Sequence, residues 1–248
     1  MTRHLLVRGG QRCGTTLLYE LLDDHPEITM ARPRRPEPKV FLSDELSERG
    51  IDWYHSTYFG HATGEVVYGE KSTSYIEDPD APKRAAVMLG VAMIIVQLRD
   101  PVARAVSNWR FSTKHGAEDR PLVQALTENL AGPRIWDPSV TSVSPFAYLE
   151  RGRYCDYLEP WHAAFPDTLH IQFLEDDPGS SASRERLYRA VGVDPSFRPV
   201  DPGRRVNASD GATPELPADL VLRLRQFFRE SDERLTALVG RPLPWAGR

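Results

Sequence analysis

A glycine-rich stretch near the start of the chain carries residue types that bind phosphate or sulfate. It follows a short apolar run at residues 5–7 and comprises Gly9, Gly10, Gln11, Arg12, Cys13, Gly14, Thr15 and Thr16. Glycines allow positive φ angles and close backbone approach, and a loop at the start of a helix presents free N–H groups to an anion. Arg12 adds a fixed positive charge with a planar set of donors. The stretch predicts a strand, an anion-binding loop and a helix over residues 17–22.

The two threonines favour a phosphate site, and the missing lysine argues against an ATP- or GTP-binding loop. Thr15 and Thr16 are predicted to cap the helix and to donate hydrogen bonds to a phosphate. The ATP- and GTP-binding pattern G-x-x-x-x-G-K-[ST] is not met, because Thr15 rather than lysine follows Gly14. A standard ATP or GTP loop is therefore disfavoured. The alternative is an ordinary strand-to-helix turn with a Thr cap, and Arg12 together with the paired threonines counts against it.

A second anion-binding stretch follows the most apolar run of the chain, residues 91–98. Such a run is typical of a strand covered on both faces by helices, and we expect it at the centre of the sheet. It leads into Arg99 and Asp100, after which Pro101 suits the first turn of a helix. Arg99 and Ser107 are predicted to converge on one phosphate. The alternative is an ion pair of Arg99 with Asp100 and a solvent-facing Ser107.

Three further side chains are candidates for acid–base or charge chemistry. Glu37 stands alone among arginines, prolines and a lysine at residues 32–42, and a carboxylate held in a cationic site can serve as a general base. That segment also fits a rigid, solvated connector. Lys71 follows an apolar run at residues 64–68, where parallel sheets place their ligands. Histidine is a common general base, which makes His115 the third candidate, although a lone histidine near a helix end is more often a surface residue.

The order of apolar runs and amphipathic stretches predicts an α/β fold. Strands alternate with helices, which indicates a three-layer arrangement around a parallel sheet. Strands are expected at residues 5–7, 64–68, 91–98 and 169–174. Helices are expected at residues 17–22, 51–59, 81–89, 102–114, 121–130, 146–165, 184–191 and 217–239. Loops are expected at residues 132–145 and 199–214.

The composition is that of one soluble globular domain. The 248 residues are 40% hydrophobic and 27% charged, with a formal net charge of −4. We therefore expect a single domain over residues 1–248, with no general attraction to nucleic acid or to anionic membranes. Cys13 and Cys155 form neither a disulfide framework nor a metal-ligand spacing. No apolar run has the length of a signal-peptide core or a membrane span, so we expect a soluble, cytoplasmic protein.

Taken together, these stretches resemble the sulfotransferases that use 3'-phosphoadenosine 5'-phosphosulfate, most closely their heparan-sulfate-type and bacterial branch. In that family a K-x-G-T-T loop after the first strand wraps the 5'-phosphosulfate of the donor, and Arg12 stands here in the lysine position. The family's R-D-P-x-x-R-x-x-S block recurs from Arg99 to Ser107. Residues 37–41, 69–72 and 152–176 also look like family blocks. The resemblance implies the three-layer parallel sheet and P-loop nucleotide-hydrolase-like topology of sulfotransferases.

The resemblance implies which residues bind the donor. Its 5'-phosphosulfate would be held by Gly10, Gln11, Arg12, Cys13, Gly14, Thr15 and Thr16. Arg99 and Ser107 would bind the 3'-phosphate. The basic loop that closes over the donor in relatives is not clearly present, and Arg204 or Arg205 is a candidate substitute for it.

The resemblance also implies how the reaction proceeds. Glu37 would take the proton of the acceptor, with His115 as the alternative base or an assistant. Arg12 would stabilise the leaving phosphate, and Lys71 would contact the sulfuryl oxygens. The acceptor is expected to be a hydroxyl of a small molecule or glycan, such as a bacterial secondary metabolite, with an amine as the alternative acceptor. The other product is adenosine 3',5'-bisphosphate. No metal is expected to take part.

Two other functions stay open at this stage. A nucleotide-dependent kinase is the first, because the strand that ends in Arg99 and Asp100 can pass for a Walker B element. The missing G-K-[ST] and the Arg99–Ser107 spacing argue against it. The second is a non-catalytic module that binds a 3'-phosphonucleotide, which Glu37, Lys71 and His115 argue against.

Overall fold

The computed structural model describes residues 2–137, 139, 143–199 and 215–247. Contacts within the chain divide it into two compact units. The first comprises Met1–Gly9, Gly14–Leu98 and Tyr157–Asn207, and the second comprises Gly10–Cys13, Arg99–Asp156 and Ala208–Arg248. The single domain expected from the sequence stays a prediction.

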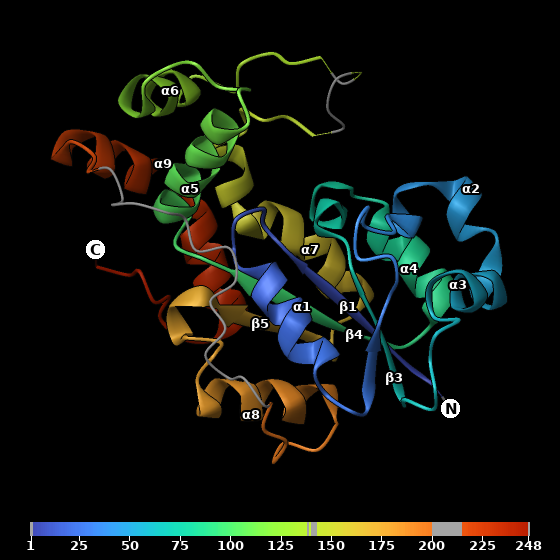
Figure 1. The fold of residues 1–248 in the computed structure, drawn as a ribbon. Helices are drawn as coiled ribbons and strands as arrows, with labels where there is room; N and C mark the ends of the chain where they lie inside the picture. Colours follow the sequence, from blue (N-terminus) through green and yellow to red (C-terminus); the bar gives the residue numbers. More distant parts are fainter. Residues whose placement is uncertain (1, 138, 140–142, 200–214, 248) are drawn as a thin grey trace. The chain divides into compact units, whose positions relative to one another are not determined.

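Five parallel strands form one sheet in the first unit, in the order β2-β3-β1-β4-β5 (Figure 1). The strands are β1 (Arg3–Gly9), β2 (Ile28–Met30), β3 (Val67–Lys71), β4 (Ala92–Leu98) and β5 (Leu169–Phe173). The middle strand is therefore β1, and the prediction that the run at 91–98 forms the centre is wrong by one position. Both β1 and β4 are buried along nearly their whole length, so apolar content does not decide between two inner strands.

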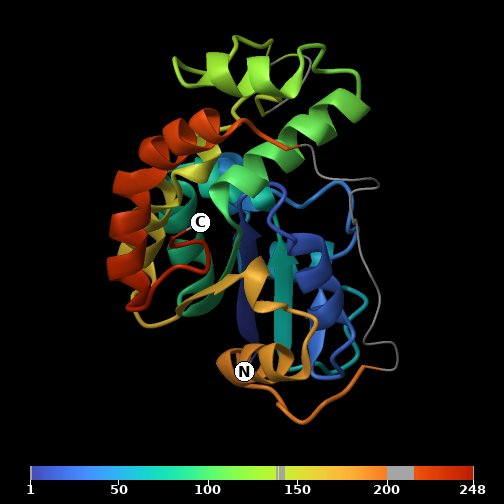
Figure 2. The same cartoon turned by 90° about the vertical axis from the view of Figure 1, so that its left-hand side faces the viewer.

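Helices cover both faces of this sheet, which confirms the predicted α/β arrangement (Figures 1 and 2). Leu5 and Val7 of β1 belong to one core with α1 (Thr15–Asp23) and α8 (Ser181–Val191). Successive side chains of a strand point to opposite faces, so Arg8 projects to the other side. There it lies fully buried over the ring of Trp161, 3.4 Å from the ring centroid. In Figure 2 the blue α1 and the teal α4 (Ala81–Leu89) flank the sheet from opposite sides.

The first unit also contains shorter elements around its strands. These are α2 (Asp44–Ser47), α3 (Gly50–Tyr58), the later part of α7 (Tyr154–Ala164) and the 3-10 turns η1 (Val40–Leu42), η2 (Thr73–Glu77) and η4 (Leu174–Asp176). The second unit is built from α5 (Pro101–Lys114), α6 (Leu122–Asn129), η3 (Glu150–Gly152) and α9 (Ala218–Val239). Its core is formed by Ala105, Leu126, Leu149, Leu224 and Phe228 among others. Across the described residues, no helix combines the length and apolarity that a membrane crossing requires.

Most predicted elements are confirmed, with three corrections. The strand expected at 64–68 runs instead over Val67–Lys71, because the polar Glu70 is satisfied inside the core by neighbouring hydroxyls. The three-residue β2 was not predicted, since so short a run has no measurable periodicity. The helix expected at 146–165 begins only at Tyr154. Most of the loop expected at 199–214 lies outside the described residues.

Candidate active site

Gly14 opens α1 in a backbone conformation that suits glycine. Its φ is 87°, and an added Cβ would lie 2.8 Å from a methyl carbon of Leu174. Because Gly14 is the N-cap, Thr15 and Thr16 lie in the first turn and their side chains do not cap the helix, contrary to the prediction. The first N–H groups of a helix have no partner inside it. Both threonines therefore offer a free backbone donor, together with hydroxyls that bond no other described residue.

Arg12 is the centre of a cationic cluster in the second unit. Its Nε–H donates to the Oγ of Ser107 at 3.2 Å, and its guanidinium lies 5.0 Å from the ring centroid of Phe111. Arg99 donates from Nη1 to the carbonyl oxygen of Arg12 at 3.4 Å. Burial lowers the pKa of the Arg12 guanidinium, and the neighbouring positive charges of Arg99 and Arg110 lower it further. Arginine stays protonated near neutral pH, so the cluster concentrates positive charge around Arg12.

Buried side chains of the second unit hold the loop that carries Arg12. The fully buried Arg104 donates to the carbonyl oxygen of Gln11 at 3.4 Å, and Arg151 donates to the Gln11 side-chain oxygen at 3.3 Å. Tyr154 donates from its hydroxyl to the carbonyl oxygen of Arg99 at 2.7 Å and contacts Cys13 Sγ at 3.6 Å. Neither Arg104 nor Arg151 was predicted as a site residue. Arg104 could have been found from its place as the second arginine of the R-D-P-x-x-R block.

Asp100 is engaged by a residue from the C-terminal helix. Its side chain accepts from the N–H of Val102 and so caps α5. Both carboxylate oxygens also accept from Arg225, each at 2.8 Å. The alternative in which Arg99 pairs with Asp100 is therefore not what the described residues form. Arg225 gave no signal in the sequence, because 125 positions separate it from Asp100.

Glu37 and Lys71 meet in the first unit. The ammonium of Lys71 donates to Oε1 of Glu37 and forms an ion pair with it. Thr73 donates to Oε2 twice, from its backbone N–H at 2.9 Å and from its hydroxyl at 3.1 Å. The side chains of Glu37 and Lys71 retain 17% and 10% exposure, so solvent reaches this group. Two candidates from separate stretches of sequence thus share one charged contact, and Thr73 is a third member that the sequence did not reveal.

The remaining candidate residues are His115, Arg204 and Arg205. His115 ends α5 on the surface, where its Nδ1–H donates to the carbonyl oxygen of Phe111 at 2.8 Å and its ring packs on the Phe111 ring. Arg204 and Arg205 lie outside the described residues.

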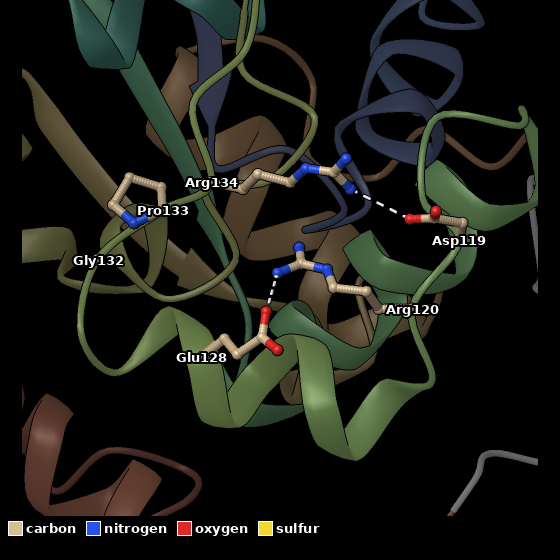
Figure 3. A pocket seen from close by; sticks show the side chains of 6 residues that line it. All are labelled: Asp119, Arg120, Glu128, Gly132, Pro133 and Arg134. Atoms are coloured by element: carbon tan, nitrogen blue, oxygen red, sulfur yellow. Dashed lines mark hydrogen bonds and ion pairs between the residues drawn. The ribbon is translucent and has the colours of Figure 1, made fainter.

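An open hollow of about 460 Å³ in the second unit is lined by both arginines and carboxylates (Figure 3). It is lined by Asp119, Arg120, Glu128, Gly132, Pro133 and Arg134. Arg134 pairs with Asp119, and Arg120 pairs with Glu128 and the buried Glu118. Both arginines are thus already paired with carboxylates. Among the residues described, no three His, Cys, Asp or Glu side chains gather in a way that suits a metal ion.

Comparison with known proteins decides the family. The profile of the family described as "Sulfotransferase domain" matches residues 2–170. This chain belongs to the sulfotransferase domain family. The resemblance predicted from the sequence is thereby confirmed.

Individual sulfotransferases are similar over almost the whole chain. The human bifunctional heparan sulfate N-deacetylase/N-sulfotransferase 3 is 29% identical over 270 residues, which cover 96% of this chain and 30% of that protein. The human heparan sulfate glucosamine 3-O-sulfotransferase 3A1 is 26% identical over 264 residues, covering 98% of this chain and 62% of that protein. This chain therefore spans less than two thirds of either relative. The crystal structure of a sulfotransferase from Alicyclobacillus acidocaldarius has the same fold, with a TM-score of 0.78, 23% identity and 98% coverage of both chains.

Proposed function

We propose that this chain is a sulfotransferase that moves a sulfuryl group from 3'-phosphoadenosine 5'-phosphosulfate to an acceptor hydroxyl. The observation that carries the proposal is the hydrogen bond from Arg12 to Ser107. It joins the glycine-rich loop to the R-D-P-x-x-R-x-x-S block in one cationic cluster, to which Arg99 also belongs. Membership of the sulfotransferase domain family supports the same donor.

The residues of the cationic cluster suit the phosphate groups of this donor. Ser107 accepts its bond from Arg12, so the Ser107 hydroxyl proton is left for a phosphate oxygen. We assign the 3'-phosphate to Ser107 and Arg99. The 5'-phosphosulfate falls to Arg12, to the backbone of residues 10–14 and to Thr15 and Thr16, because N–H groups at a helix start favour an anion. Gln11 contributes its backbone N–H, while its side-chain oxygen accepts a hydrogen bond from Arg151.

Transfer breaks the bond between sulfur and the 5'-phosphate oxygen and forms a bond between sulfur and the acceptor oxygen. The acceptor proton goes to Glu37. A carboxylate has about four acceptor positions, and Lys71 and the two Thr73 donors occupy three of them, which leaves one for this proton. Arg12 stabilises the charge that develops on the leaving phosphate, as preorganised donors do in phosphoryl transfer. Lys71 contacts the sulfuryl oxygens, and His115 is the alternative base.

The remaining parts of the proposal concern the acceptor and the setting. We place the enzyme in the cytoplasm, acting without a metal on a small molecule or glycan such as a bacterial secondary metabolite. The net charge of −4 favours neither nucleic acid nor anionic membranes as a partner. The product besides the sulfated acceptor is adenosine 3',5'-bisphosphate.

Labelled donor tests this function directly. The protein is incubated with ³⁵S-labelled donor, EDTA and a panel that contains a phenol, an aliphatic alcohol, a disaccharide and an amino sugar. We expect the label to appear on a hydroxyl acceptor. Donor binding with no transfer to any acceptor or to water would favour a non-catalytic module. Magnesium-dependent transfer of phosphate from ATP would favour a kinase, and either result would contradict the proposal.

A further inference from the structure

Glu70 is a buried carboxylate that the proposed reaction does not use. It lies on β3 in the first unit with none of its surface exposed. Three hydroxyls donate to it: Tyr75 to Oε1 at 2.5 Å, Ser72 to Oε1 at 2.7 Å and Tyr54 to Oε2 at 2.7 Å. Burial raises the pKa of Glu70, while these three hydrogen bonds lower it. A buried carboxylate is costly, so a set of donors this complete calls for an explanation.

Two of these hydroxyls also accept hydrogen bonds from residues 39 and 41. Each hydroxyl has a single proton, and Ser72 and Tyr75 spend theirs on Glu70. Their oxygens therefore accept, and the donors are backbone N–H groups from the segment that follows Glu37. Lys39 donates from its N–H to Ser72 Oγ at 3.0 Å, and Phe41 donates from its N–H to the Tyr75 hydroxyl at 3.3 Å. Because Glu70 can only accept when ionised, it fixes the direction of both chains of hydrogen bonds.

The segment at residues 39–41 begins with a backbone conformation that is unfavourable for a residue other than glycine. Lys39 has φ 55°, in the left-handed region that residues other than glycine rarely adopt. Such a residue persists where its surroundings supply compensating bonds. Lys39 lies two positions after Glu37 and opens the turn η1, so Glu37 directly precedes the segment whose backbone Ser72 and Tyr75 bind.

The opposite side of the same strand end holds the Glu37 carboxylate itself. Side chains alternate along a strand, so Glu70 and Ser72 face inward while Lys71 faces the other way. Lys71 and the following Thr73 bind the Glu37 carboxylate. One short stretch, residues 70–75, therefore binds both the carboxylate of Glu37 and the backbone just after it.

We propose that Glu70 is a positioning residue that, through the hydroxyls of Ser72 and Tyr75, fixes the backbone of residues 39–41 and so the placement of the Glu37 carboxylate. The inference rests on the proposed function only for the role of Glu37 as the base. The hydrogen-bond relay itself is a property of the fold. It is the reason that a glutamate, rather than an apolar residue, stands inside this part of the core.

Two tyrosines provide a matched test. Tyr54→Phe and Tyr75→Phe each remove one buried hydroxyl that donates to Glu70, but only Tyr75 also accepts from the segment after Glu37. In the full chain, we would measure amide hydrogen exchange at Phe41 and the pH titration of the ¹³C-labelled Glu37 carboxyl. Tyr75→Phe should raise exchange at Phe41 by about tenfold, the size expected for one lost hydrogen bond, and should shift the Glu37 titration. Tyr54→Phe should change neither, although both variants lower thermal stability.

A second pair of variants addresses Glu70 itself. Glu70→Gln keeps an acceptor oxygen for Ser72 and Tyr75 and should retain most of the protection at Phe41, whereas Glu70→Leu should lose it. If Glu70→Leu does not fold, the tyrosine pair decides. Equal effects of Tyr54→Phe and Tyr75→Phe, or an unchanged Glu37 titration in Tyr75→Phe, would overturn the proposal. Neither measurement needs turnover, so failure of the relay can be told from failure of the sulfotransferase assay with ³⁵S-labelled donor.

Discussion

The Nε–H of Arg12 donates a hydrogen bond of 3.2 Å to the Oγ of Ser107, 95 positions later in the chain. The contact leaves the serine proton free, and the Arg12 guanidinium lies over the ring of Phe111. Since Arg99 also reaches the backbone of Arg12, three residues with anion-binding chemistry converge in the second unit. Their convergence underlies the predictions on donor binding.

Ser107→Ala should weaken binding of adenosine 3',5'-bisphosphate by about 10- to 150-fold, the loss expected for one hydrogen bond to a charged group. Equilibrium dialysis with labelled bisphosphate measures the affinity. Ser112→Ala is the matched control, because Ser112 is a buried serine of the same helix whose hydroxyl donates to the Pro145 carbonyl oxygen. Equal loss in both variants would mean that Ser107 acts through the helix and not through the ligand.

Glu37→Gln should lower sulfuryl transfer by about 10²- to 10⁴-fold, the usual contribution of a general base, and leave bisphosphate affinity within about twofold. The amide keeps the shape of the side chain but does not take the acceptor proton. Transfer of ³⁵S label per minute is the measurement. The exposed Glu45 serves as the control through Glu45→Gln. Wild-type turnover in Glu37→Gln would remove Glu37 from the mechanism and move attention to His115.

Asp100→Ala should lower the free energy of unfolding by about 2–4 kcal/mol, because the change removes a helix cap and leaves Arg225 without its carboxylate. Urea denaturation followed by circular dichroism gives this value. Asp119→Ala is the control, since Asp119 is 84% exposed in its pair with Arg134 (Figure 3), and exposed pairs contribute about 0–1 kcal/mol. Similar losses in the two variants would contradict the importance of the Asp100 contacts.

His4 should make stability depend on pH between about 6.5 and 4. Burial lowers the pKa of His4 to about 4, and the neighbouring His55, whose Nε2 lies 2.8 Å from that of His4, contributes to the shift. The unfolded chain takes up this proton near pH 6.5, so between the two values the unfolded state binds more protons and stability falls as the pH falls. His4→Gln should reduce that fall in urea unfolding at pH 4.5 relative to pH 7.5. An identical pH dependence in both proteins would contradict the lowered pKa.

Local patterns in the sequence were sufficient for most elements of the fold. Helix α4 has the predicted bounds, and the apolar run at 91–98 became β4, because burial of a periodic apolar face decides both. The position of each strand in the sheet could not be predicted from composition, since β1 and β4 are both buried along nearly their whole length although β4 is the more apolar. Only the strand pairing shows that β1 is the middle strand. The short β2 depends on its neighbour β3 and has no local signal.

In the candidate site, too, the contiguous stretches were predicted and the contacts between distant residues were not. The glycine-rich loop and the Arg99 block are written in contiguous residues, so both were predicted. The residues that hydrogen-bond to these stretches were not predicted, because they are distant in the sequence. Arg225 donates to Asp100, and Arg151 donates to Gln11. The relay at Glu70 was missed as well, because its donors become neighbours only when β3 and the turn η1 are packed.

Calorimetric titration without magnesium tests the central claim, a site for a 3'-phosphonucleotide. Adenosine 3',5'-bisphosphate, ADP and ATP are titrated into the wild-type protein, into Arg99→Ala and into Arg223→Ala, an exposed arginine of α9 that serves as the control. We predict that only the bisphosphate binds tightly, and that Arg99→Ala alone abolishes this binding. Preference for ATP, or equal binding of the bisphosphate by wild type and Arg99→Ala, would contradict the account.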